Sequence, residues 1–220
     1  MDGLLSKAYA AKRRRAFDPT KAQSHTWGDP AGDTTVFVVM DERGNLVSVI
    51  QSLFHAFGSR VVPPGTGIVL HNRGTYFSVD PAHPNALAPR KRPFHTLIAS
   101  IVTREERPVA GFATMGSNGQ AMFHVQVLTN VLDYGLDIQE AIERPRFLIG
   151  PFTPDEPVDT IRLESRVPAR VIAALGRRGH RIKPERDFFQ KMGHAHGIAV
   201  RDGTLMGGAD PRGDGAALGW

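Results

Sequence analysis

The clearest pattern in the chain is a pair of apolar runs separated by a polar turn. The first run covers residues 35–40 (TVFVVM) and the second covers residues 46–50 (LVSVI). The residues between them, DERGN at 41–45, include Gly and Asn, which tolerate the positive φ angles of tight turns. The pattern predicts a β-hairpin, and the continuous apolar character of the first run is typical of a strand covered on both faces.

A loop of residues 41–45 would also set the register of this hairpin. It pairs Met40 with Leu46, and counting back along both strands then places Thr34 opposite Ser52. Two hydroxyl side chains would therefore meet at the open end of the hairpin.

The rest of the chain alternates short apolar segments with turns and helical patterns. Further strands are predicted at residues 67–71, 97–103, 109–114, 198–200 and 205–207. Helices are predicted at residues 3–16, after Gly119, between the capping-box sequence at 137–140 and Pro145, and at 167–178. The apolar face of the helix after Gly119 is predicted to hold Met122, Val125, Leu128, Val131 and Leu132. Residues 18–33 are typical of an exposed linker, and the whole pattern indicates a mixed fold with mainly antiparallel strand pairs.

Composition narrows the class of protein. The chain has 220 residues, of which 41% are hydrophobic and 22% are charged, which is typical of a folded domain and not of a disordered tail. No apolar run approaches the roughly 20 residues needed to span a bilayer. The absence of cysteine excludes disulfides, Cys-ligated zinc and thiol nucleophiles. Neither an H-E-x-x-H spacing nor a P-loop is present, so we expect no metal and no cofactor.

The net charge of +5 invites a nucleic-acid-binding interpretation. The one dense basic run is confined to residues 12–15, however, and no zinc-finger spacing or helix-turn-helix pattern accompanies it. A solvated helix face is the favoured interpretation of such a run. We therefore expect no nucleic-acid partner.

Thr34 lies at the start of the first predicted strand, directly after the linker. A Thr hydroxyl is a weak nucleophile unless a base lies beside it, and a chain-terminal Thr supplies that base through its own α-amine, whose pKa is about 8. This chemistry requires cleavage between Asp33 and Thr34. Because Thr is also a common strand former, the spacing alone favours an ordinary structural role.

A second candidate is the sequence TMGSNG at 114–119, between a predicted strand and a helix. Its small residues Gly116 and Ser117 would let backbone N–H groups point into a site at the start of the helix, where such donors can hold an oxyanion. An ordinary tight strand-to-helix turn fits the same residues. For His194 and His196, the sequence favours a surface or hydrogen-bonded role over metal binding.

Taken in order, these residues resemble the small subunit of the gamma-glutamyltransferase (gamma-glutamyltranspeptidase) family, in particular its acylase-like branch. The resemblance runs from about residue 32 to the C-terminus. It is carried by the segments GDTT (32–35), DERGN (41–45), FG (57–58), PGTGI (64–68), KRP (91–93), MG (115–116), EAIERPR (140–146) and DPRGDG (210–215). Each segment is short, but their order and spacing are specific.

The resemblance implies an α+β fold, the N-terminal nucleophile hydrolase αββα sandwich, of which this chain would hold the small-subunit part. It implies a zymogen that cuts itself before Thr34 and then uses the freed Thr as the nucleophile for acyl transfer to water or an amine. The family's second hydroxyl falls on Ser52, and its paired oxyanion glycines fall on Gly116 and Ser117, with Ser in place of the second Gly. The implied activities are gamma-glutamyl transfer and the hydrolysis of glutathione-like amides.

The departures from the family pattern concern the substrate. In the family's transferases an Asn, a Gln and an Asp bind the glutamyl amine. The corresponding positions in this sequence are Phe54, Arg73 and Tyr76. The Ser pair that binds the glutamyl carboxylate falls on His95 and Thr96. A pocket that loses its acidic residue and gains an Arg disfavours a free α-ammonium group. We therefore predict an acyl group that bears a carboxylate and need not bear an amine, as in a glutaryl amide, with Arg73, His95 and Thr96 as its recognition residues.

Members of this family also carry a large subunit that shares the central sheets. The resemblance implies that residues 1–33 are the end of that subunit and its linker, and that residues 34–220 are the catalytic region. The expected partners are a small-molecule acyl donor and a large subunit from a separate or upstream segment, without which apolar sheet surfaces would be exposed. The alternative interpretation is an inactive fragment that keeps this part of the fold without catalysis.

Overall fold

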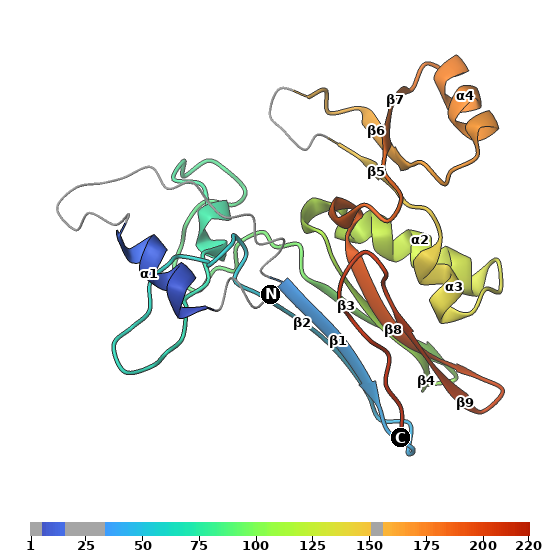
Figure 1. Ribbon diagram of the computed structural model, residues 1–220, viewed down its shortest axis with the longest axis horizontal. Helices are drawn as coiled ribbons and strands as arrows, with labels where there is room; N and C mark the ends of the chain where they lie inside the picture. The colour runs from blue at the N-terminus through green and yellow to red at the C-terminus, as the bar shows by residue number, and fades with distance from the viewer. Residues whose placement is uncertain (1–5, 16–33, 151–155) are drawn as a thin grey trace. The chain divides into compact units, whose positions relative to one another are not determined.

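The computed structural model describes residues 6–15, 34–150 and 156–220 (Figure 1). The chain divides into two compact units, Met1–Ala31 and Gly32–Trp220. In the first unit, helix α1 spans Lys7–Arg15, within the range predicted for it, and Ser6 Oγ accepts the Tyr9 N–H at 3.1 Å near its start. The predicted linker at 18–33, including Asp33, lies outside the described residues.

The predicted hairpin and its register are confirmed in the second unit. Strands β1 (Thr34–Met40) and β2 (Leu46–Ser52) pair antiparallel, and Thr34 lies opposite Ser52. The register therefore brings the two predicted hydroxyl side chains to the same end of the hairpin.

The turn of the hairpin is held by Asp41. Its carboxylate accepts hydrogen bonds from the Asn45 side chain at 2.7 Å and from the Asn45 backbone N–H at 2.8 Å. These donors favour the ionised carboxylate and lower the pKa of Asp41. A closed Asx-type turn of this kind fixes the loop length on which the register depends.

A four-stranded antiparallel sheet forms the centre of the second unit. In spatial order its strands are β3 (Ile98–Arg104), β4 (Arg107–Met115), β8 (His194–Arg201) and β9 (Thr204–Ala209). The sequence predicted all four, although β8 begins earlier than expected, at His194. The β8–β9 connection is a two-residue turn in which Asp202 and Gly203 both have positive φ, a geometry that matches the twist of the strands it joins.

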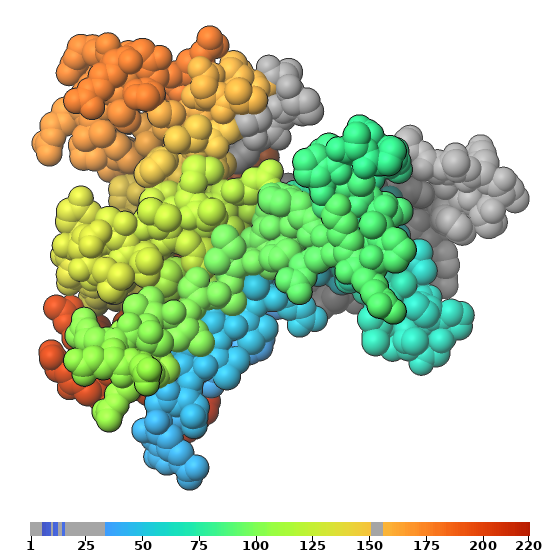
Figure 2. Space-filling view, turned by 180° about the vertical axis from the view of Figure 1, so that it is seen from behind, coloured from blue at the N-terminus to red at the C-terminus, as the bar shows by residue number. Residues whose placement is uncertain are grey.

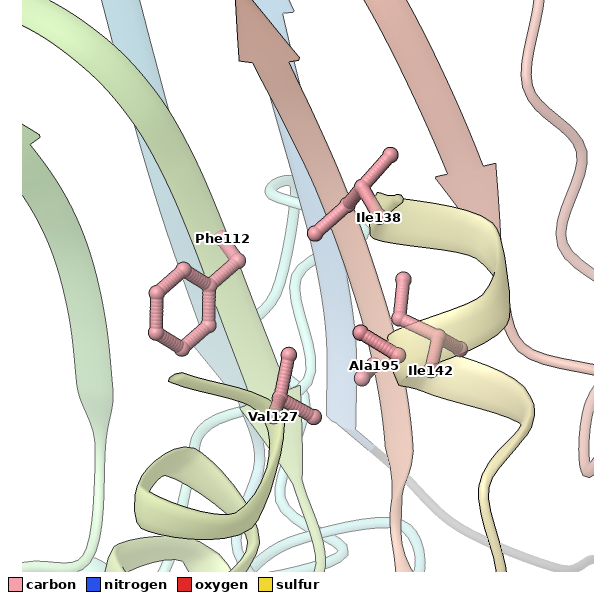
Figure 3. Packing of buried hydrophobic residues seen from close by; sticks show 6 residues of the cluster. Phe112, Val127, Ile138, Ile142 and Ala195 are labelled. Atoms are coloured by element: carbon pink, nitrogen blue, oxygen red, sulfur yellow. The ribbon is translucent and has the colours of Figure 1, made fainter. Parts of the chain in front are cut away.

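Two helices cover one face of this sheet, α2 (Gln120–Leu132) and α3 (Ile138–Glu143). Asp137 caps α3 by accepting the Glu140 N–H at 2.8 Å, as the capping-box sequence predicts. The apolar core between sheet and helices is drawn in Figure 3 and consists of Phe112, Val127, Ile138, Ala141, Ile142 and Ala195.

The predicted buried face of α2 is right only in part: Met122, Leu128 and Val131 pack against the buried core, but Val125 does not. Val125 is 64% exposed, whereas Phe123, His124 and Val127 are buried. The reason is that His124 faces the sheet, where both of its ring nitrogens have polar partners. They lie 3.2 Å from Ser100 Oγ and 3.1 Å from the Ile98 carbonyl oxygen. A satisfied polar side chain on the inner face shifts the helix away from the face that an apolar count favours.

The β1–β2 hairpin packs on the opposite face of the four-stranded sheet, so hairpin, sheet and helices form three successive layers (Figure 1). Ser48 Oγ donates to the Phe112 carbonyl at 3.1 Å, and the Leu46 side chain fills the space in front of Gly111. Figure 2 shows the tip of the hairpin, in blue, extending past the green residues of the neighbouring strands.

The outer face of the hairpin is not covered by the described residues. Phe37, Val39 and Val47 on that face are 46%, 51% and 53% exposed. The described residues cover only the side of the first strand that faces β4 and β8. An apolar surface of this kind is typical of a face that packs against further chain.

A third, three-stranded sheet was not predicted from the sequence. It contains β5 (Phe147–Ile149), β6 (Thr160–Glu164) and β7 (Arg181–Glu185), with the predicted helix α4 (Ala169–Arg177) connecting the parallel strands β6 and β7. Its strands are short, and β6 alternates apolar with charged residues that turn out to be buried. Because the charged residues of β6 are buried in ion pairs, its hydropathy pattern does not indicate a buried strand.

The predicted strand at 67–71 is also wrong. This segment has no regular structure, and Ile68 in it is 62% exposed. Gly65 and Gly67 have positive φ, which bends the backbone away from an extended ladder. Three short 3₁₀ turns complete the described structure: η1 (Arg73–Tyr76), η2 (Ser117–Gly119) and η3 (Gln190–Met192).

Candidate active site

The hairpin register brings the Thr34 and Ser52 hydroxyls into contact. Thr34 Oγ1 lies 2.7 Å from Ser52 Oγ, and Ser52 Oγ also accepts the Phe54 N–H at 2.9 Å. Both strand residues are half-buried. Ser52 is therefore held by the backbone beyond β2 and orients the Thr34 hydroxyl, as a positioned hydrogen-bond partner does.

The turn after β4 contains the predicted oxyanion residues. Gly116 has a φ of 138°, and a Cβ on it would lie 2.7 Å from the Phe123 ring and 2.9 Å from Gly193 Cα. Only glycine fits there. Ser117 has a φ of 51°, in the left-handed region, and the turn's own hydrogen bond joins the Gly119 N–H to the Gly116 carbonyl at 3.1 Å.

The hydrogen bond within the turn joins the Gly119 N–H to the Gly116 carbonyl oxygen. It therefore uses neither the Gly116 N–H nor the Ser117 N–H. The Ser at the second position keeps its backbone donor while adopting a conformation that a side chain rarely takes. Backbone strain that the surrounding packing imposes is typical of functional turns.

A pocket of about 280 Å³ opens beside Thr34 between the hairpin and the central sheet. Thr34, Thr35, Val36, Met115, His194, His196, Asp214 and Gly215 line it. Met115 immediately precedes Gly116, so the nucleophile candidate and the oxyanion turn border the same cavity.

The sequence did not indicate His194 and His196 as parts of this site. They occupy alternate positions of β8, and both line the pocket. Gly213 and Gly215 of the C-terminal segment pack against the two rings so closely that a Cβ on either glycine would overlap them. The signal that points to this arrangement is the period-two spacing of the histidines together with the glycines near the end of the chain.

Burial lowers the pKa of His194 and the pKa of His196, although the nearby Asp210 carboxylate opposes the shift. Both imidazoles are therefore held in the neutral form at neutral pH. Neutral rings beside Thr34 leave the pocket without added positive charge.

A cluster of fully buried charges fixes β8 and the C-terminal segment. Arg146 pairs with Asp210 at 2.6 Å, and Arg212 pairs with Glu164 at 2.6 Å. Asp210 also accepts the Ala195 N–H at 2.8 Å. Although burial raises the pKa of Asp210, the positive charges of Arg146 and Arg212 outweigh it and hold that pKa below its usual value.

The predicted recognition residues Arg73 and Thr96 come together with two aromatic rings. Arg73 Nη1 lies 3.5 Å from Thr96 Oγ1, and the Arg73 guanidinium carbon lies 4.1 Å from the Phe54 ring centroid and 5.4 Å from that of Tyr76. We call these four residues the acyl cluster. Phe54 connects the cluster to Thr34, since its N–H binds the same Ser52 oxygen that contacts Thr34.

His95 is not part of this cluster. It is exposed, and among the described residues none of the hydrogen bonds or ring contacts that join the cluster involves it. The three His, Asp or Glu residues that a metal ion needs are nowhere gathered in the described part of the chain. Within those same residues, every helix is too short or too polar to cross a bilayer.

Comparison with known proteins gives the family. The family model for gamma-glutamyltranspeptidase matches residues 1–220. The chain is 41% identical over 222 residues to the glutathione hydrolase-like YwrD proenzyme of Bacillus subtilis, covering 100% of this chain and 42% of that protein. It is 42% identical over 207 residues to the oxamate amidohydrolase proenzyme of Klebsiella pneumoniae, covering 93% of this chain and 39% of that protein.

A solved structure gives the same result for the fold. The cephalosporin acylase of Bacillus halodurans superposes with a TM-score of 0.76 at 38% identity, over 99% of this chain and 39% of that one. The chain thus spans about two fifths of the length of the curated relatives it matches. Its α+β arrangement is that of the N-terminal nucleophile hydrolases, and the chain belongs to the gamma-glutamyltranspeptidase family.

Proposed function

We propose that this chain is the catalytic part of an amide hydrolase or acyltransferase in which Thr34, freed by self-cleavage after Asp33, is the nucleophile. The observation that carries the proposal is the 2.7 Å contact between Thr34 Oγ1 and Ser52 Oγ beside the pocket. The curated relatives named above are both proenzymes, which fits a chain activated by cleavage.

The chemistry proceeds in two steps. In the first, Thr34 Oγ attacks the amide carbonyl carbon, its proton passes to the Thr34 α-amine, and that proton then leaves with the departing amine as the C–N bond breaks. In the second, water attacks the Thr34 ester, and the same amine takes a proton from the water and returns one to Oγ. Ser52 orients the hydroxyl throughout, while the Gly116 and Ser117 N–H groups stabilise the oxyanion of each tetrahedral intermediate.

The acyl group in this proposal bears a carboxylate and no amine. Arg73 supplies the positive charge for that carboxylate, and Thr96 supplies a hydroxyl. The Arg73 guanidinium already lies over the Phe54 ring, and the acyl cluster contains no carboxylate that could pair with an ammonium group. Oxamate, named for the Klebsiella relative, is likewise an amide whose acyl part carries a carboxylate and no amine.

A large subunit completes the enzyme in this proposal. The exposed apolar side chains of Phe37, Val39 and Val47 provide a face against which such a subunit can pack. The chain's coverage of only 42% of the YwrD-like relative leaves length for such a subunit.

The test compares two chromogenic amides of equal chain length. With the chain co-expressed with its preceding coding sequence, we expect a higher kcat/KM for glutaryl-anilide than for gamma-glutamyl-anilide, because Arg73 repels the α-ammonium group. A clear preference for gamma-glutamyl-anilide contradicts the substrate assignment. Loss of all turnover in Thr34→Ala, with folding retained, is expected if Thr34 is the nucleophile.

A further inference from the structure

The acyl cluster is tied to the catalytic groups at two separate points. On one side, the Phe54 N–H binds Ser52 Oγ, the partner of Thr34. On the other side, Tyr76 Oη donates to Asn118 Oδ1 at 3.3 Å, and Asn118 belongs to the η2 turn that follows Gly116. The cluster therefore bridges the nucleophile and the oxyanion turn.

The Tyr76 hydroxyl is held at a fixed position. Its ring packs against Phe54 at 4.8 Å and edge-on against Phe94 at 5.3 Å between ring centroids. Asn85 holds the backbone on both sides, because its Nδ2 donates to the Tyr76 carbonyl at 2.6 Å and its Oδ1 accepts the Phe94 N–H at 3.1 Å. The two aromatic neighbours and the hydrogen bonds of the Asn85 amide together hold the Tyr76 ring, so its hydroxyl points in one direction.

The turn that Tyr76 contacts has a strained backbone. Gly116 and Ser117 both have positive φ, and no side chain caps the start of η2. The Asn118 side chain gives this strained turn a hydrogen-bond acceptor through which a neighbouring element can hold it in place. Tyr76, which donates the hydrogen bond to Asn118, belongs to the same 3₁₀ turn as Arg73.

We propose that Tyr76 is a positioning residue that couples an acyl carboxylate bound at Arg73 to the backbone donors of Gly116 and Ser117. This inference rests on the proposed function of the site. A carboxylate on Arg73 would bind a guanidinium that lies 5.4 Å from the Tyr76 ring, so the bound acyl group would act on the ring whose hydroxyl contacts the oxyanion turn. Discrimination between acyl groups then appears mainly in kcat, because the donors act on the transition state.

The test uses Tyr76→Phe, which keeps the ring and removes only the hydroxyl. For glutaryl-anilide we expect kcat to fall about fivefold to tenfold with KM within about twofold of wild type, as for the loss of one hydrogen bond. For butyryl-anilide, which has no carboxylate for Arg73, we expect kcat within about twofold. Asn118→Ala should give the same pattern, and the double variant should lose no more than either single variant.

Equal losses for both substrates, or additive losses in the double variant, overturn the coupling. Tyr134→Phe is the matched control, because Tyr134 is 73% exposed, and it should leave both substrates unaffected. An active wild type with an unchanged Tyr76→Phe variant overturns this inference alone. A wild type that neither cleaves before Thr34 nor hydrolyses either amide overturns the proposed function and this inference together.

Discussion

The hydroxyl oxygens of Thr34 and Ser52 lie 2.7 Å apart across the open end of the β1–β2 hairpin. Ser52→Ala removes this partner, so we expect slower cleavage before Thr34 and a kcat lowered by about 10- to 100-fold. Time-resolved intact-mass analysis and anilide kinetics measure the two effects.

Ser48→Ala is the matched control for that variant. Ser48 lies on the same strand and donates to the Phe112 carbonyl at 3.1 Å, away from the nucleophile. It should reduce stability slightly and leave cleavage unchanged. Equal effects of the two substitutions on cleavage would count against a specific role for Ser52.

Arg73→Ala should lower kcat/KM for glutaryl-anilide by roughly 10- to 100-fold while changing the value for butyryl-anilide little, because only the first acyl group carries a charge for the guanidinium. Arg92→Ala, on the same long connection and exposed, serves as the control. If kcat/KM falls equally for both substrates, Arg73 supports the fold of the pocket and does not recognise the acyl group.

Gly116→Ala should destabilise the chain by about 3 kcal/mol, because the new Cβ would meet both the Phe123 ring and Gly193 Cα at a positive φ. Gly65→Ala isolates the backbone part of this cost, since Gly65 also has positive φ but nothing within 4 Å of a Cβ; we expect a loss of about 1 kcal/mol. Urea denaturation gives both values, and equal losses would contradict the packing argument.

Stability should fall as the solution is acidified below neutral pH. Burial lowers the pKa of His124 from 6.5 to about 4, although its contact with the Ile98 carbonyl opposes the shift. Between those two pH values the unfolded chain binds more protons than the folded chain, so the free energy of unfolding decreases as pH falls. The lowered pKa values of His194 and His196 act in the same direction.

Urea denaturation at pH 7 and pH 5 measures this effect. His124→Gln should lose less stability between the two pH values than wild type does. His180→Gln, at an exposed position, should follow wild type. A wild-type stability that rises on acidification contradicts the assignment of a neutral buried His124.

The hairpin was predictable because local turn chemistry determined it. Asp41 and Asn45 close the loop, the loop length sets the register, and the register brings Thr34 to Ser52. The contact between Arg73 and Thr96 follows from the family resemblance, which placed both residues at substrate-binding positions; the structure then brings them within 3.5 Å.

The remaining features depend on tertiary pairing that hydropathy does not record. Strand β6 carries Arg162 and Glu164 into the interior, where ion pairs with Glu185 and Arg212 offset their burial. His194 and His196 line the pocket, where Gly213 and Gly215 of the C-terminal segment pack against them. The Tyr76–Asn118 hydrogen bond joins two irregular segments, and no periodic pattern marks such a contact.

The central claim is that Thr34 becomes the N-terminal nucleophile of the active chain. Intact-mass analysis of the chain, co-expressed with its preceding coding sequence, tests this most directly, with Thr34→Ser and Thr34→Ala as paired variants. We predict a new chain that begins at Thr34 in wild type, slower cleavage at the same bond in Thr34→Ser, and a folded but uncleaved Thr34→Ala. A wild type that stays intact, or a Thr34→Ala variant that is still cut before residue 34, would contradict the account.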